Sequence, residues 1–188
     1  MNQDWRELQK LAHQTFTAHV ESVTDWSAPT PDVEWDVRQL VSHVIEEQQW
    51  VPHLLAGRTI GEARARMDPL SDDLVAEWHR HSATATDAWS AVDLNASVRL
   101  SYDTMPASQY LSEQVADVIV HSWDLARAIG ADDRLDDALV EAAWSVFEPQ
   151  RDTLEASGLY ASPVTVDPAA PLQSKLLALT GRDDRVAA

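Results

Sequence analysis

One predicted helix carries an acid and an imidazole at a spacing suited to chemistry. In the segment 117–130, DVIVHSWDLARAIG, Asp117 and His121 are four residues apart within an otherwise apolar pattern. Glu113 and Asp124 lie within roughly a quarter turn of this pair, because residues three and four apart are neighbours on a helix. Burying a carboxylate without a partner costs several kcal/mol. The pattern therefore predicts a metal ion close by or, as the alternative, a hydrogen bond or cap within the helix itself.

A second predicted helix supplies the missing half of a metal site. His43 lies at the edge of its apolar face, with Glu47 and Trp50 on the same side. Together with Asp117 and His121, this histidine would make a three-ligand site between facing helices, as helical bundles can. Three protein ligands leave at least one position open for water or substrate, which is typical of catalytic zinc. Two histidines and one carboxylate also suit Fe²⁺ or Ni²⁺.

The elements that must position these side chains are helices. Apolar residues recur every three or four positions and predict helices at about residues 3–24, 36–57, 72–91, 106–130 and 136–154. Segment 97–102 alternates like a short strand, and a proline-rich tail leads to a short helix at 172–181. We therefore expect an all-α, four-helix up-down bundle with an accessory strand or loop and a C-terminal arm, forming a single domain over residues 1–188.

Composition limits the partners. The chain has 14 basic and 31 acidic residues and a net charge of −17, which argues against nucleic acid and anionic membranes. An 18-residue apolar run and the apolar core of a signal peptide are both missing, so we expect a cytoplasmic protein. Cysteine is absent, and any thiol chemistry needs a thiol from outside. Arginine outnumbers lysine twelve to two and alanine is abundant, which is compatible with an actinobacterial host.

Three segments carry a resemblance to a known family. They are PDVEWDVRQLVSHVIEEQQWVPHLLAGRTIGE, VADVIVHSWDLARAIG and LLALTGRD. In this order they resemble the actinobacterial branch of the DinB-like superfamily, which includes the N-terminal domain of mycothiol-dependent maleylpyruvate isomerase. The resemblance covers nearly the whole chain. It implies a DinB-like four-helix bundle with a divalent metal, usually zinc, whose ligands fall on His43, Asp117 and His121.

The chain departs from that family in two ways. The isomerase has glutamate where this chain has Asp117, and an aspartate reaches one methylene less far, so ligand distance or metal choice can differ. The isomerase also continues into a further C-terminal domain, whereas this chain ends about where the bundle and its arm end. We therefore do not expect the isomerase reaction itself.

The resemblance implies mycothiol as the external thiol. A zinc-bound thiol has a lowered pKa and is presented as a thiolate, which would attack a small electrophilic substrate. Glu47 or Glu113 could act as the base or as the partner of a ligating imidazole, although solvated helix charge is the alternative for each. The predicted function is a metal-dependent thiol transferase or isomerase. The alternative is a non-catalytic metal- or small-ligand-binding bundle, and the sequence is compatible with a homodimer.

Four side chains near these helices receive structural roles. Asp124 and Arg127 are expected to form an i,i+3 ion pair, which contributes little when exposed. Trp50 and Trp123 occur at helical spacing, which is more typical of a hydrophobic core than of a substrate pocket. Neither tryptophan is assigned a catalytic role.

Overall fold

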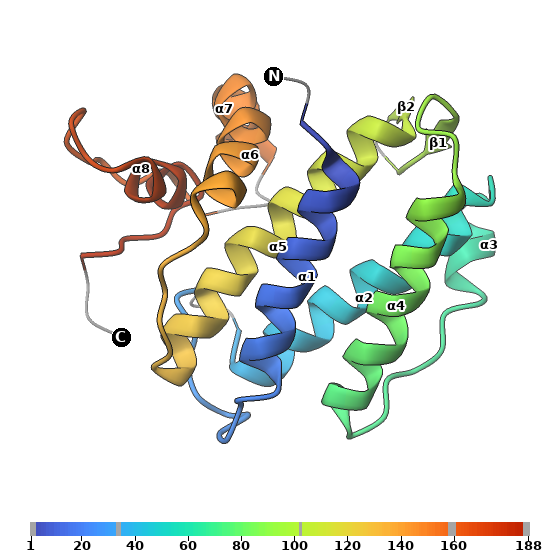
Figure 1. Ribbon diagram of the computed structural model, residues 1–188, viewed down its shortest axis with the longest axis horizontal. Coiled ribbons are helices and arrows are strands. Elements are labelled where there is room, and N and C mark those ends of the chain that lie inside the picture. The colour runs from blue at the N-terminus through green and yellow to red at the C-terminus, as the bar shows by residue number, and fades with distance from the viewer. Residues whose placement is uncertain (1–2, 33–34, 102, 158–160, 186–188) are drawn as a thin grey trace.

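Four long helices form the body of the protein. The structure is a computed structural model and describes residues 3–32, 35–101, 103–157 and 161–185. The long helices are α1 (Trp5–Val20), α2 (Val37–Leu55), α4 (Leu74–Ala91) and α5 (Ala107–Ile129). Around the bundle, α1 packs against α5 and α4, while α2 packs against α4 and α5. The predicted all-α four-helix bundle is confirmed (Figure 1).

The helix ends follow from local sequence signals. At the start of α2, the Asp36 carboxylate accepts a hydrogen bond from the Gln39 amide, and the Gln39 side chain accepts one from the Asp36 amide. This is the capping box expected from the sequence. Gly130 ends α5 with φ of 69°, a left-handed conformation that glycine adopts without steric cost. The first helix ends at Val20 rather than near 24, because the backbone then changes to i,i+3 hydrogen bonds.

Two small elements connect the long helices. Helix α3 (Ile60–Arg64) was not among the predicted helices, although Thr59 and Glu62 form a capping box at its start. Strands β1 (Ser97–Arg99) and β2 (Thr104–Pro106) form an antiparallel hairpin before α5. The predicted strand at 97–102 is thus half as long, and its last residue, Tyr102, lies outside the described residues.

The C-terminal third lies along one side of the bundle. The helix predicted at 136–154 is divided into α6 (Asp137–Phe147), a 3₁₀ turn (Glu148–Gln150) and α7 (Arg151–Ser157). Pro149 explains the division, because proline has no amide hydrogen to continue the helix. Helix α8 (Leu172–Leu179) forms the predicted arm and packs against α6, on the side of the molecule opposite α4 (Figure 1).

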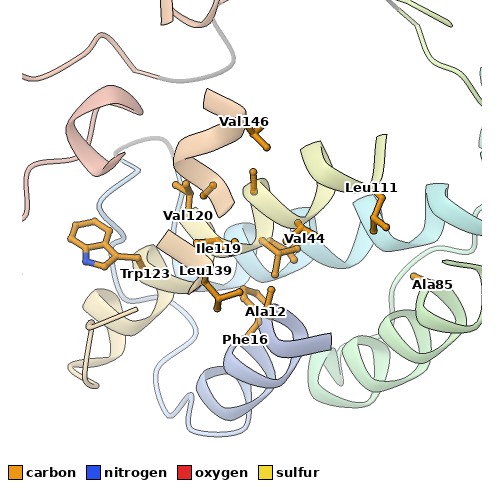
Figure 2. Packing of buried hydrophobic residues seen from close by; sticks show 14 of the residues in the cluster. Ala12, Phe16, Val44, Ala85, Leu111, Ile119, Val120, Trp123, Leu139 and Val146 are labelled. Carbon is orange, nitrogen blue, oxygen red and sulfur yellow. The ribbon is translucent and has the colours of Figure 1, made fainter. Parts of the chain in front are cut away.

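The hydrophobic core is continuous across the bundle. Figure 2 shows side chains from α1, α2, α5 and α6 converging, among them Phe16, Val44, Ile119 and Leu139. Helix α5 is buried nearly all round, as its sequence predicts for a central helix. Trp123 lies in the core, and the half-buried Trp50 packs against the outside of this core. Among the described residues, none of the helices combines the length and apolar character that a membrane crossing requires.

Candidate metal centre

The interface between α2 and α5 brings together the three side chains predicted as metal ligands. Helix α2 places His43 in its second turn, and α5 places Asp117 and His121 one turn apart. One ligand atom from each residue lies within 4.8 Å of those of the other two. Asp117 Oδ1 lies 3.5 Å from His121 Nε2, and Asp117 Oδ2 lies 3.9 Å from His43 Nε2. The shorter aspartate side chain therefore reaches both imidazoles.

The three side chains differ in exposure. The side chains of His43 and Asp117 are 32% and 23% exposed, whereas that of His121 is 4% exposed. The cluster thus has a buried inner ligand and an outer side that faces the surface. His43 and Asp117 are therefore the members of the cluster that solvent reaches most easily.

The donor set and spacing fit one divalent cation. Atoms about 2.0–2.1 Å from a tetrahedral zinc lie about 3.3–3.4 Å from one another. The observed spacing, within 4.8 Å, is wider than this, so the partly exposed His43 and Asp117 would move inward on binding the ion. Two imidazole nitrogens and a carboxylate oxygen are donors that zinc, nickel and iron accept.

Trp35 forms one wall of the cluster. The sequence pattern did not predict it as a neighbour of the candidate ligands. Its ring centroid lies 4.6 Å from that of His43 and 5.6 Å from that of His121. The residue directly precedes Asp36, the N-cap of α2, where an apolar side chain often packs back onto the helix. That position predicts packing, but only the fold shows that the packing partners are the two histidines.

Asp124 is the buried partner of His121. Its Oδ2 lies 3.2 Å from His121 Nδ1, and its side chain is fully buried. The predicted Asp124–Arg127 ion pair is wrong, because Asp124 pairs with Arg182, at 2.8 Å, and Arg127 pairs with Asp133, at 2.7 Å. The physical reason is direction: Asp124 faces the C-terminal arm, while the guanidinium of Arg127 lies over the Trp123 ring.

The carboxylates around His121 control its charge. Burial lowers the pKa of His121, but Asp117 and Asp124 outweigh burial and raise that pKa to about 9. Burial likewise lowers the pKa of His43, and Asp117 offsets this only in part. Burial favours protonation of Asp124, yet His121 and Arg182 hold its pKa below the usual value. A site whose carboxylates hold a proton on His121 also favours a divalent cation in place of that proton.

The two glutamates proposed as bases have different surroundings. Glu47 lies one turn after His43, and its carboxylate accepts a hydrogen bond of 3.1 Å from Gln114 of α5. Burial, followed by the charge of Asp117, raises the pKa of Glu47 to about 7. Glu113 instead accepts a hydrogen bond of 3.1 Å from Gln109 on the exposed side of α5. Glu47 therefore has the environment of a group that can exchange a proton near neutral pH.

A comparison with known protein families matches the largest part of the bundle. The model of the mycothiol maleylpyruvate isomerase N-terminal domain matches residues 10–126, which include all three candidate ligands. The chain belongs to this family. Two relatives in Mycobacterium tuberculosis, the uncharacterized proteins MT0763 (strain CDC 1551 / Oshkosh) and Rv0738 (strain ATCC 25618), are each 30% identical over 151 residues, covering 74% of this chain and 80% of theirs.

Solved structures support the same fold. The crystal structure of the mycothiol-dependent maleylpyruvate isomerase superposes with a TM-score of 0.66 at 19% sequence identity, covering 88% of this chain and 75% of that one. A histidine-to-alanine mutant of that isomerase gives a TM-score of 0.65 at 17% identity, with the same coverage. The resemblance to the DinB-like, maleylpyruvate isomerase-type bundle is thereby confirmed.

Proposed function

We propose that this protein is a divalent-metal-dependent enzyme of the thiol S-transferase or isomerase type, with mycothiol as thiol and a small electrophile as substrate. The observation that carries the proposal is the convergence of His43, Asp117 and His121 at the surface end of the α2–α5 interface. Membership of the mycothiol maleylpyruvate isomerase N-terminal domain family supports mycothiol as the cosubstrate. The absence of cysteine agrees with a thiol that comes from outside the chain. We also propose a cytoplasmic location, where low-molecular-weight thiols are kept reduced.

His43, Asp117 and His121 would hold the cation, and we favour zinc over nickel or iron. Zinc accepts two imidazoles and one carboxylate while leaving a position for a further ligand. The surface-facing side of the cluster, formed by His43 and Asp117, is where a thiol can arrive. A divalent cation bound here would lower the pKa of a thiol ligand and supply a thiolate nucleophile.

Glu47 is proposed as the residue that takes up the thiol proton. It lies on the same face of α2 as His43, and Gln114 fixes its carboxylate by a hydrogen bond. Its raised pKa suits a base that must also release the proton at neutral pH. Glu113 is the second candidate for this role or for the partner of a ligating imidazole, and we favour Glu47 because the hydrogen bond between Glu113 and Gln109 lies on the exposed side of α5.

The test is turnover by metal-loaded protein incubated with mycothiol and a panel of small electrophiles. We expect thiol-dependent conversion of at least one electrophile by wild-type protein and none by Asp117→Asn. Calorimetry should show mycothiol binding only when metal is present. A protein that binds metal but neither binds mycothiol nor turns over any electrophile would instead be a non-catalytic metal-binding bundle.

A further inference from the structure

The C-terminal arm reaches the metal centre through one buried arginine. Arg182 follows α8 and is 4% exposed, which is rare for a charged residue. Gly181 precedes it with φ of 81°, and a Cβ at that position would come within 2.6–2.8 Å of Ala161. Glycine is therefore needed here, because the close approach and the left-handed backbone turn the chain so that Arg182 points back into the bundle.

The guanidinium of Arg182 joins three parts of the chain. Its Nε and Nη2 donate to the two oxygens of Asp124, at 3.2 and 2.8 Å. Nη2 also donates to Asp32 in the α1–α2 connection, at 3.2 Å, and Nη1 donates to the carbonyl of Thr180, at 2.7 Å. A two-pronged contact of this kind fixes both the position and the plane of the carboxylate.

Asp124 passes this constraint on to a candidate ligand. Its Oδ2 is 3.2 Å from His121 Nδ1, while His121 Nε2 faces Asp117. A metal-binding imidazole usually donates its second N–H to a carboxylate that orients the ring. We propose that Arg182 is a positioning residue of the metal centre, which acts through Asp124 to orient His121. The inference rests on the proposed function, since it assigns the C-terminal arm a part in metal affinity.

A purely structural role for Arg182 predicts a different outcome. An ion pair that only fastens the arm would change the stability of the fold and leave the affinity of folded protein for metal unaltered. A positioning residue changes that affinity as well, because His121 becomes free to rotate away from the ligand geometry. The two roles are separated by measuring affinity and stability on the same variants.

The experiment compares zinc affinity in Arg182→Gln, Arg182→Lys and Leu74→Ala, by competition with a chromophoric chelator. We expect Arg182→Gln to bind zinc roughly 10–100-fold more weakly than wild type. Arg182→Lys should lie between them, because lysine keeps the charge but lacks the two-pronged contact. Leu74→Ala removes a buried side chain of α4, which contributes no ligand, and should lower stability without changing zinc affinity. If Arg182→Gln does not fold, Arg182→Lys carries the same test.

A second readout works on metal-free protein. The Nδ1–H proton of His121 should be visible by NMR in the wild type, since Asp124 protects it from exchange, and should broaden in Arg182→Gln. Failure of the wild type to bind any divalent metal would remove the proposed function, and this signal would still decide whether Arg182 orients His121. The inference is overturned if the arginine variants lose stability as Leu74→Ala does, yet keep wild-type zinc affinity and an unchanged His121 signal.

Discussion

Two histidines on opposite sides of the bundle are buried to a similar extent but respond to burial in opposite directions. His13, on α1, is 8% exposed, and His121, on α5, is 3% exposed. Burial lowers the pKa of His13 to about 4, whereas the pKa of His121 is raised to about 9. Depth alone therefore does not determine the charge of these imidazoles.

The difference comes from the neighbouring groups. His13 lines a groove of about 540 Å³ between α1 and α4, where its neighbours are the side-chain amides of Gln9, 2.9 Å away, and Gln48, and the ring of Trp78. His121 has a carboxylate near each ring nitrogen, Asp117 and Asp124. Neutral partners make a buried histidine neutral, and paired carboxylates make it a site for a cation. The two environments thus separate a structural histidine from a candidate ligand.

The strongest test of this contrast is to remove each imidazole in turn. We expect His121→Ala to lose zinc binding by more than the roughly 10–100-fold typical of residues that only support a ligand. His13→Gln should keep wild-type affinity, because α1 contributes nothing to the cluster. Zinc affinity of both variants is measured by chelator competition. Equal losses of affinity would show that His13 and His121 do not differ in their importance for metal binding.

The next largest effect concerns proton transfer beside the cation. If Glu47 takes up the thiol proton, Glu47→Gln should lower the rate of thiol-dependent turnover by roughly 10²–10⁴-fold while zinc stays bound. Glu113→Gln is the matched control, one helix away and half-buried as well, and should retain most of the rate. Steady-state kinetics with mycothiol in excess would check this, and a larger loss in the Glu113 variant would reverse the assignment.

A smaller effect is expected in the pH dependence of stability. His13 has a lower pKa in the folded protein than in the unfolded chain, so the unfolded state takes up its proton first as the pH falls. The free energy of unfolding is therefore unaffected by protonation of His13 above about pH 6.5. It falls as the pH is lowered towards 4, by about 3 kcal/mol at most. Urea denaturation across this range should show the loss in wild type and a flatter profile in His13→Gln.

The same experiment has an internal control at alkaline pH. His121 has a raised pKa in metal-free protein, so its contribution is present below about pH 6.5 and is lost as the pH rises through about 9. His13→Gln should leave this alkaline loss intact. If His13→Gln reduced the acid loss and the alkaline loss of stability equally, the two histidines would not be titrating independently.

The smallest effect is expected at the rim of the α1–α4 groove. His79 Nε2 lies 3.0 Å from a Glu21 oxygen, and both side chains are about half exposed. Exposed pairs of this kind contribute between about 0 and 1 kcal/mol. His79→Gln should therefore change neither the denaturation midpoint appreciably nor zinc affinity. A clear loss of zinc affinity in His79→Gln would mean that changes in the groove alter the candidate metal centre.

Local spacing predicted part of the candidate ligand cluster from the sequence. Asp117 and His121 share a helix face through the four-residue period, and His43 occupies the apolar edge of another amphipathic helix. Helix geometry alone determines which residues share a face, so these placements do not depend on the rest of the fold. The same reasoning predicted the capping box at Asp36 and the glycine that ends α5.

The parts that sequence reasoning missed are contacts between distant segments. Arg182 is 58 residues from Asp124 and 150 from Asp32, so helical spacing gives no sign of either ion pair. Instead it suggested Arg127, which is near Asp124 along the chain but pairs with Asp133. Trp35 carried a signal for packing onto α2, but its contact with His121 depends on how α2 and α5 are packed together.

Elemental analysis of protein purified without a metal-affinity column tests the central claim most directly. Wild-type protein should carry one divalent cation per chain, and His121→Ala purified in parallel should carry none. His13→Gln should match the wild type. Wild-type protein without bound metal, or metal retained in full by His121→Ala, would contradict a centre formed by His43, Asp117 and His121.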